Sequence, residues 1–589
     1  MSADQAPIIE LRDVSFSYSA EGAPALSHVS LAINEGEFVG VIGPSGAGKS
    51  TLAAALSGAI PHHFAGKLYG AVLVGGRDTC EVSLTDISAV VGSVLQDIDA
   101  QMVASVVEDE MLFGLENFGV PHDQIESRIE GALQTVGIAH LRDREIATLS
   151  GGQKQKVAIA AILALAPRVL VLDEPTAALD PASSTMVFET LRQVNRLGGI
   201  TVVVIEQKVA LLCKYCKRVL VVSEGELAFD GEPHEVFGHP RELRALGVDS
   251  PRVARIANSL LEHGAIERVE RPCLNVPEAT EFISGLVGHV EKGKVVTVPA
   301  PSRHKRASAS RAEAADAVVD VRDVCFAYPN QGDSVSGLNL QVYPGELVAI
   351  IGQNGAGKTT FTKLLNGLLR PKSGSIRIVG MDTREVPTSA IAAQCATLFQ
   401  NPDRQLCKDT VLEEVAFGLT LHGTPEAEAR ERAAEVIRRF DLPADESPFS
   451  LSRGQRQMVA LASVVVLDPE VVLLDEPTSG LDYRECMTVM ETVREMAERG
   501  CAVIMVCHDM EVVSDFAERV VVMTKGKIAG AGDADAMFAD DELMAAAYVE
   551  PPQVNALSKK LAATVSPAFA GVTQVSGIVD IVEEMIKRG

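Results

Sequence analysis

Two stretches of the sequence carry the residue types needed to hold phosphate groups. Residues 43–50 read GPSGAGKS and residues 352–359 read GQNGAGKT, and both fit the pattern GxxxxGK[ST]. In such a loop, glycines let backbone N–H groups turn inward, the lysine neutralises phosphate charge, and the final hydroxyl ligates Mg²⁺. The expected phosphate-binding residues are Gly43, Pro44, Ser45, Gly46, Ala47, Gly48, Lys49, Ser50 and Thr51, with Gly352, Gln353, Asn354, Gly355, Ala356, Gly357, Lys358, Thr359 and Thr360.

Two further stretches end in a pair of acids. VLVLDE places Asp173 and Glu174, and VVLLDE places Asp475 and Glu476, directly after a run typical of a buried strand. The first acid of each pair suits a place facing a metal ion, and the second suits polarising an attacking water. Acids that merely cap a strand end are the alternative, which would not explain their occurrence together with a phosphate-binding loop.

The segments around the two loops are those that a phosphate-binding loop needs. The apolar runs FVGVI (38–42) and LVAII (347–351) precede the loops, and helical runs follow them. A loop between a strand and a helix N-terminus presents its amides and the helix dipole to an anion. The sequence therefore predicts an α/β fold with the loops at the ends of strands.

The motifs recur in the same order, so the chain contains an internal duplication. LRDVSFSYSA (11–20) matches VRDVCFAYPN (321–330), and VLVLDEPTAALD (169–180) matches VVLLDEPTSGLD (471–482). We expect one catalytic domain in each repeat, each followed by a C-terminal extension. The predicted boundaries are 1–250 and 318–548 for the domains, 251–298 and 549–589 for the extensions, and 299–317 for a flexible linker. A short helix in this Ala-, Ser- and Arg-rich linker is the alternative.

A third motif makes the resemblance to one family specific. LSGGQKQK (149–156) and LSRGQRQM (451–458), which precede the acidic strands, resemble the signature motif of ATP-binding cassette (ABC) ATPases. The resemblance covers both repeats. It implies two tandem ABC-type P-loop NTPase domains, each with a RecA-like core, an antiparallel β subdomain, a helical signature subdomain and a short C-terminal extension. It also implies hydrolysis of ATP with Mg²⁺.

The same resemblance assigns roles to further residues. Tyr18 and Tyr328 match the aromatic that stacks on adenine, for which ordinary strand packing is the alternative. Asp180 and Asp482 match the loop that crosses between cassettes. The nucleotide-contacting signature residues are Ser150, Gly151, Gly152 and Gln153 in the first repeat, and Ser452, Arg453, Gly454 and Gln455 in the second. The implied metal-site residues are Ser50, Gln96, Asp173, Thr359, Gln400 and Asp475.

In ABC ATPases each site pairs the phosphate loop of one cassette with the signature of the other, so the halves are expected to pair within the chain as a pseudo-dimer. Here the two sites differ: Gln207 stands where the second repeat has the switch residue His508, and Arg453 replaces a signature glycine. Both departures fall on site one, which we expect to hydrolyse ATP slowly. The alternative is that both are tolerated. The expected catalytic residues are Glu174, Gln96 and Gln207 in site one, and Glu476, Gln400 and His508 in site two.

Composition limits the partners. The net charge of −26 argues against nucleic acid as the main partner. The longest apolar run, at 157–166, is shorter than the roughly 18 residues of a membrane-spanning helix. The N-terminal residues do not read as a secretion signal, and the scattered cysteines suit a reducing compartment. We therefore expect the compartment to be cytoplasmic.

The segments after the two glutamines indicate which class of ABC ATPase this is. QDIDAQMVASVVEDEMLFGLEN (96–117) and QNPDRQLCKDTVLEEVAFGL (400–419) are similar to those of energy-coupling factor (ECF) importers of vitamins or transition-metal ions. This implies a peripheral protein that binds a transmembrane coupling subunit and a membrane-embedded substrate-binding subunit. Docking is expected near Asp99 and Asp403, although solvated helix-capping acids are the alternative. A twin-cassette ATPase acting on ribosomes or RNA is the other function left open.

Overall fold

The computed structural model describes residues 6–19, 22–177, 179–269, 271–287, 316–329 and 333–588. The chain forms two compact units. The first contains Met1–Ala257 and Arg268–Asn275, and the second contains Asn258–Glu267 and Val276–Gly589. Residues 299–315 of the expected linker lie outside the described residues, so the linker stays a prediction.

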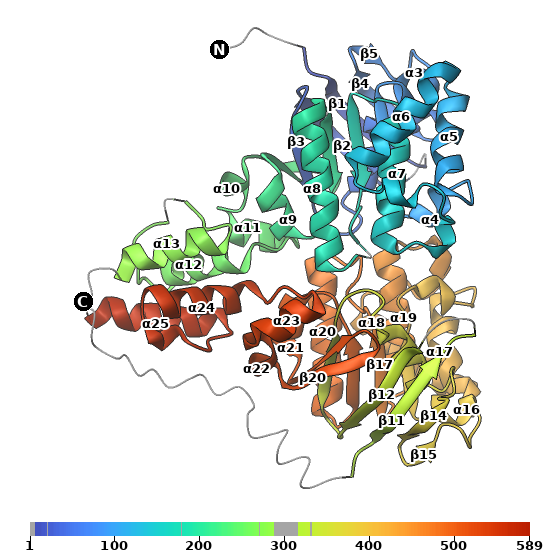
Figure 1. Cartoon of the computed structure of the whole chain (residues 1–589), viewed down its shortest axis with the longest axis vertical. Helices are drawn as coiled ribbons and strands as arrows, with labels where there is room; N and C mark the ends of the chain where they lie inside the picture. Colours follow the sequence, from blue (N-terminus) through green and yellow to red (C-terminus); the bar gives the residue numbers. More distant parts are fainter. Residues whose placement is uncertain are drawn as a thin grey trace. The chain divides into compact units, whose positions relative to one another are not determined.

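The first unit contains a six-stranded sheet, of which strand β3 is labelled in Figure 1. Its strands are β3 (Phe38–Ile42), β6 (Val91–Val94), β7 (Val169–Asp173), β8 (Thr201–Ile205), β9 (Arg218–Ser223) and β10 (Glu226–Gly231). Their order is β10–β9–β3–β8–β7–β6, and every pair is parallel except the edge pair β10–β9. Strands β3 and β8 are buried along their whole length, as expected for a parallel sheet covered on both faces.

The two faces of this sheet support different layers. Phe38 and Ile42 belong to a core cluster shared with the helical region, whereas Val39 and Val41 belong to a cluster shared with the β subdomain and α1 (Lys49–Leu56). The β subdomain is an antiparallel sheet in the order β2–β1–β4–β5. Its strands are β1 (Ile9–Ser17), β2 (Leu26–Ile33), β4 (Lys67–Val74) and β5 (Arg77–Asp78). Alternating burial along β2 places one face of this sheet in the core.

The second unit repeats this topology strand for strand. Its central sheet has the order β20–β19–β13–β18–β17–β16, and its antiparallel sheet the order β12–β11–β14–β15. The central strands are β13 (Leu347–Ile351), β16 (Cys395–Leu398), β17 (Val471–Asp475), β18 (Ala502–Val506), β19 (Arg519–Thr524) and β20 (Lys527–Asp533). The others are β11 (Val319–Ala327), β12 (Asp333–Val342), β14 (Ser373–Ile378) and β15 (Met381–Asp382). The predicted α/β duplication is confirmed.

Each unit also contains a helical subdomain between its sheet strands. In the first unit the helices are α4 (Ile98–Gln101), α5 (Val107–Asn117), α6 (His122–Thr135), α7 (Gly151–Ala164), α8 (Pro181–Gly198) and α9 (Val209–Tyr215). Their counterparts are α17 (Val411–Leu421), α18 (Glu426–Arg439), α19 (Arg453–Val465), α20 (Tyr483–Glu498) and α21 (Met510–Phe516), with α15 (Lys358–Leu365) matching α1. Helices α7 and α19 contact other helices of their subdomains and also the edge strands β6 and β16. They therefore join each helical subdomain to its sheet. No helix in the described part of the chain is long and apolar enough to cross a membrane.

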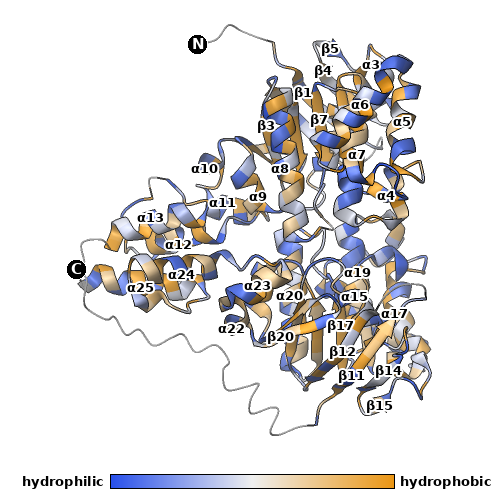
Figure 2. Ribbon diagram, viewed as in Figure 1, coloured by the Kyte–Doolittle hydropathy of each residue, from blue (hydrophilic) through white to orange (hydrophobic). Residues whose placement is uncertain are grey.

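The C-terminal extension of the first repeat packs on that of the second. Helix α13 (Val276–Val287) contacts α24 (Gln553–Thr564) and α25 (Val575–Arg588), and all three lie in the second unit. These helices carry hydrophobic as well as hydrophilic residues (Figure 2), and Ile283, Leu557 and Ile578 are fully buried. Nδ1 of His263 lies 2.6 Å from a carboxylate oxygen of Glu583. The extensions therefore form one small helical core with contributions from both repeats.

Replacing Ile283 by aspartate should disrupt this core. Ile283 is fully buried, and a charge in its place costs roughly 3 kcal/mol or more, because the carboxylate is removed from water. We expect faster amide hydrogen exchange in α13 and α24, measured by mass spectrometry, with no change in the central sheets. Glu281→Ala on the exposed face of α13 is the control and should leave exchange unaltered. Unchanged exchange in Ile283→Asp would contradict the packing.

Candidate nucleotide-binding and hydrolysis sites

The strand order brings distant parts of the sequence to one edge of each sheet. In the first unit β3, β8, β7 and β6 are consecutive neighbours, and their carboxyl ends lead to the phosphate loop, Gln207, Glu174 and Gln96. The second unit does the same with β13, β18, β17 and β16. Because the strands are parallel, these ends meet at one edge of the sheet. Each unit therefore assembles its own set of predicted catalytic residues.

The phosphate loops are closely packed turns whose lysines reach back over them. A Cβ atom at Gly43 would lie 2.0 Å from the carbonyl oxygen of Val222, so only glycine fits there. Nζ of Lys49 donates hydrogen bonds to the carbonyl oxygens of Gly43 and Pro44, at 2.8 and 2.7 Å. In the second unit Nζ of Lys358 bonds the corresponding carbonyls at 2.6 and 2.9 Å. The loops thus hold their lysine amines next to the backbone that phosphate would contact.

The second acid of each pair occupies an unusual backbone conformation. Glu174 has φ 46° and Glu476 has φ 52°, in the left-handed region that costs a non-glycine residue about 1 kcal/mol or more. Their N–H groups donate to the carbonyls of Ile205 and Val506 on the neighbouring strands, at 3.0 and 2.9 Å. Strain of this kind is found where function demands a particular side-chain direction. Both repeats have this strained conformation at the glutamate that is expected to act as the general base.

The first acid of each pair fits a divalent cation. Oδ1 of Asp173 and Oδ1 of Asp475 are buried and lack a hydrogen-bond partner among the described residues. Ser50, at the start of α1, hydrogen-bonds the Asp173 carboxylate. A buried oxygen without a donor is costly unless a cation or water satisfies it. These carboxylates and the hydroxyls of Ser50 and Thr359 are the oxygen ligands that Mg²⁺ prefers.

In the first unit the expected base has neutral partners. Oε2 of Glu174 accepts a 2.6 Å hydrogen bond from Nε2 of Gln96, and Oε1 accepts one of 3.3 Å from Nε2 of Gln207. Burial, together with the negative charge of nearby Glu206, raises the pKa of Glu174 to about 7. The switch position beside this carboxylate is therefore occupied by a neutral amide, Gln207, and not by a histidine.

In the second unit the corresponding carboxylate has a histidine beside it. Oε2 of Glu476 accepts a 2.8 Å hydrogen bond from Nε2 of Gln400, and Oε1 lies 2.9 Å from Nε2 of His508. Burial acts to raise the pKa of Glu476, but His508, Lys358 and Gln400 together outweigh burial and hold the pKa below its usual range. Burial and the Glu476 charge raise the pKa of Asp475 to about 6. The two sites thus differ electrostatically at the residue expected to activate water.

Two residues next to the switch position add to this difference. Glu206 is buried and accepts hydrogen bonds from the Thr176 hydroxyl and from the N–H groups of Gln207 and Lys208. Nζ of Lys208 donates to the carbonyls of Thr176 and Leu179, at 2.9 and 3.1 Å. The second repeat has Cys507 and Asp509 at these two positions. The sequence analysis missed this pair, although aligning the repeats at Gln207 shows both differences.

The signature residues lie at the starts of α7 and α19. Oγ of Ser150 accepts from the N–H of Gln153 at 3.3 Å, and Oε1 of Gln153 accepts from the N–H of Ser150 at 3.0 Å. Ser452 and Gln455 form the same capping box in the second unit. A Cβ at Gly480 would lie 3.4 Å from Nε of Arg453, so this arginine side chain covers the loop that follows Glu476.

The acids expected at the docking surface are joined to the signature helices. Nζ of Lys154 lies 2.6 Å from Oδ1 of Asp99, and Nε of Arg456 lies 3.2 Å from Oδ1 of Asp403. Both cations belong to the helices α7 and α19. The carboxylates remain 75% and 47% exposed, so each retains acceptor capacity for a second donor. These ion pairs were not anticipated from sequence.

The expected adenine-stacking aromatics differ in their surroundings. The ring of Tyr18 packs edge-on against Phe16 at 4.9 Å, and Tyr328 packs in the same way against Phe326 at 5.0 Å. The hydroxyl of Tyr18 also lies 3.1 Å from the hydroxyl of Thr51. Tyr18 therefore stands beside the phosphate loop of its own unit.

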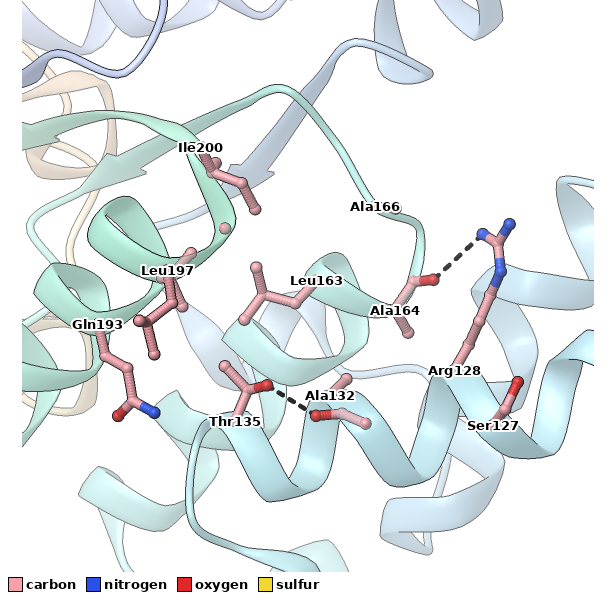
Figure 3. Close-up of a pocket in the computed structure, with 13 residues that line it drawn as sticks. Ser127, Arg128, Ala132, Thr135, Leu163, Ala164, Ala166, Gln193, Leu197 and Ile200 are labelled. Atoms are coloured by element: carbon pink, nitrogen blue, oxygen red, sulfur yellow. Dashed lines mark hydrogen bonds between the residues drawn. The ribbon is translucent and has the colours of Figure 1, made fainter.

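A separate cavity of about 390 Å³ lies among helices α6, α7 and α8 of the first unit (Figure 3). Leu163, Leu197 and Ile200 make part of its wall, and Arg128 reaches across to the carbonyl of Ala164 at 3.4 Å. None of the predicted nucleotide-binding residues lines it. This cavity is therefore not part of the candidate site.

Comparison with known proteins agrees with this geometry. The family model described as ABC transporter matches residues 26–177 and 335–479. A provisionally named ABC transporter ATP-binding protein of Caldanaerobacter subterraneus subsp. tengcongensis is 35% identical over 559 residues, covering 94% of this chain and 96% of that protein. A provisionally named HMP/thiamine import ATP-binding protein, YkoD of Bacillus subtilis, is 33% identical over 539 residues, covering 91% and 93%.

Among solved structures, CbiO1 of Clostridium perfringens, described as part of the ABC transporter complex CbiONQ, is 29% identical with a TM-score of 0.37 and covers 43% of this chain and 96% of that chain. The family model matches one segment in each repeat, and the relatives align along nearly the whole chain. This chain accordingly belongs to the ABC transporter family, as an ATP-hydrolysing protein with two tandem ABC domains that works with Mg²⁺.

Proposed function

We propose that this protein is the peripheral ATPase of an ECF-type importer of vitamins or transition-metal ions. It would bind a transmembrane coupling subunit and a membrane-embedded substrate-binding subunit at the cytoplasmic face of the cell membrane. The resemblance of the segments after Gln96 and Gln400 to those of ECF importers supports this, as does the relative named for HMP/thiamine import. The acidity of the chain does not favour the ribosome or RNA alternative.

The two cassettes would pair within the chain and enclose two ATP molecules. Site one would combine the first phosphate loop, Tyr18 and the signature at Ser452–Gln455, and site two the second loop, Tyr328 and the signature at Ser150–Gln153. When bound beside Asp173 or Asp475, Mg²⁺ neutralises part of the negative charge of the phosphates. The lysines hold the phosphates, the tyrosines stack on adenine, and the glutamate beside each metal-facing aspartate orients the attacking water.

The two sites would have different roles in the ATPase cycle. Site two has His508 to place an imidazole donor at the γ-phosphate, and the lowered pKa of Glu476 favours the carboxylate form that activates water. Site one has the neutral Gln207, with the additional negative charge of Glu206 nearby. We therefore assign most hydrolysis to site two and nucleotide retention to site one.

The observation that carries the importer proposal is the ion pair between each post-glutamine acid and its signature helix. A membrane subunit that bound at Asp99 or Asp403 would pull on the same helix whose first residues contact nucleotide. Val103 and Phe113, which follow Asp99 in the same segment of the sequence, are exposed, as expected for a surface that receives an amphipathic helix. Binding and nucleotide state would thereby be coupled mechanically.

Affinity purification from native membranes in mild detergent tests the proposal. We expect a multi-span scaffold and small membrane proteins to co-purify. We expect Asp403→Arg to reduce their recovery by about tenfold or more, because it reverses a charge at the interface and repels Arg456. Glu431→Arg, an exposed charge reversal on α18, is the matched control and should not change recovery.

Two results would count against this function. Full recovery of the membrane proteins with Asp403→Arg would remove docking from this surface. Recovery of ribosomal proteins, with the chain absent from membranes, would replace the importer with the translation-factor alternative.

A further inference from the structure

The first repeat contains an inserted loop that the second repeat lacks. Gly58 and Gly367 occupy equivalent places, since a Cβ at either would collide with the isoleucine side chain of Ile87 or Ile391. Gly70 and Gly374 are equivalent in the same sense, each lying against two carbonyls of its neighbouring strand. These glycines are 12 positions apart in the first repeat and 7 in the second, so the first carries five more residues.

The segment that contains the five additional residues, Ala59–Gly66, is anchored at several points. The side chain of Ile60 is fully buried, and Nε2 of His62 lies 2.8 Å from the carbonyl oxygen of Thr79. The N–H of Phe64 donates to the carbonyl of Ala59 at 3.0 Å. A Cβ at Gly66 would lie 2.5 Å from both the Phe16 ring and the carbonyl of Ser17, so the segment closes tightly on the strand that carries Tyr18. These contacts fix the conformation of the loop and the position of Phe64.

This loop places a second aromatic ring beside the tyrosine expected to stack on adenine. The rings of Phe64 and Tyr18 are 6.0 Å apart and nearly perpendicular, at 89°. Phe64 is 40% exposed and Tyr18 is 48% exposed, so both retain surface that a planar ligand can cover. The Tyr18 hydroxyl lies next to Thr51, directly after the phosphate loop, which puts the aromatic pair at the rim of the phosphate site.

We propose that Phe64 and Tyr18 together form the base-binding surface of site one, so that the adenine of ATP is contacted on two sides there. This proposal rests on the proposed function, which places adenine on Tyr18. Two perpendicular rings confine a flat purine more than one ring does, and each stacking or edge contact with a base adds affinity. The second repeat supplies Phe326 and Tyr328 but has no counterpart of Phe64 in its sequence. Site one therefore holds its nucleotide more tightly through the base, in agreement with a retaining role.

The test uses the full-length chain carrying Lys358→Ala, so that binding reports on site one. Competition against a ribose-labelled fluorescent ATP gives dissociation constants for ATP and for inorganic tripolyphosphate, which lacks the base. Loss of one base–aromatic contact should weaken ATP binding by about 5- to 20-fold in Phe64→Ala. Tripolyphosphate binding should stay unchanged, Phe64→Tyr should bind ATP normally, and Phe64→Leu should resemble Phe64→Ala.

The reciprocal background, Lys49→Ala, is the control for location, because Phe64→Ala should not alter ATP binding at site two. Unchanged ATP binding by Phe64→Ala in the Lys358→Ala chain would overturn the inference and leave the proposed function standing. Equal losses of ATP and tripolyphosphate binding would overturn it as well, since the loop would then only support the fold. Absence of ATP binding to the Lys358→Ala chain with Phe64 intact would instead refute nucleotide retention at site one, and the inference with it.

Discussion

Glu476→Gln is expected to lower steady-state ATP hydrolysis by about 10²- to 10⁴-fold, the range typical of losing a positioned general base. Glutamine keeps the shape of the side chain but cannot accept a proton from water. Glu174→Gln should lower the same rate by less than about twofold, because site one contributes little turnover when its switch residue is the neutral Gln207. Phosphate release by the purified chain measures both rates.

The pair of variants is its own control, since the two carboxylates share backbone conformation and glutamine contacts. Nucleotide binding should persist in both variants. Equal losses in Glu174→Gln and Glu476→Gln would show that the two sites hydrolyse ATP to similar extents. The asymmetric assignment would then be wrong, although the ATPase function would not.

His508→Gln gives site two the switch residue of site one and should lower turnover by about 10²-fold or more, the usual cost of losing a donor to developing negative charge. Nε2 of His508 lies 2.9 Å from Oε1 of Glu476, whereas the corresponding contact in site one, from Nε2 of Gln207 to Oε1 of Glu174, is longer at 3.3 Å. Steady-state hydrolysis again provides the measurement. A rate above half that of the natural chain would refute a special role for this histidine.

The converse exchange should restore only part of the activity at site one. Gln207→His alone keeps the buried Glu206, whose negative charge helps raise the pKa of Glu174 to about 7. Adding Glu206→Cys copies the second repeat, and we expect the double variant, in a Glu476→Gln chain, to hydrolyse ATP faster than the single variant. If the single variant is already as fast, Glu206 has no part in the asymmetry.

The repeated motifs were sufficient to predict the fold class and the ATPase activity. A glycine-rich phosphate loop after an apolar strand needs specific residue types at fixed spacing. The pattern therefore predicts Lys49 and Lys358 as the lysines of these loops without a structure. The same holds for the acids at the ends of β7 and β17, because buried parallel strands read as continuous apolar runs. Motifs that depend on local backbone geometry can therefore be recognised from the sequence.

Contacts of side chains whose roles no motif indicates could not be predicted from the sequence. Lys154 and Arg456 read as ordinary helix charges until the structure pairs them with Asp99 and Asp403. Glu206 reads as the end of a strand, yet it is buried and bonded to the hydroxyl of Thr176. Such contacts depend on which surfaces meet, and spacing along the chain carries no information about that.

By itself, the sequence determined that this protein has two cassettes, that each contains a motif of the phosphate-binding type, and that Gln207 and His508 differ. Only the tertiary structure decided that Gln96 and Glu174 touch across 78 positions, that Phe64 stands against Tyr18, and that α13 packs on α24. The physical reason is that local motifs follow from backbone conformation and residue type. Long-range contacts depend on strand order, loop anchoring and burial, which are set only when the whole chain packs.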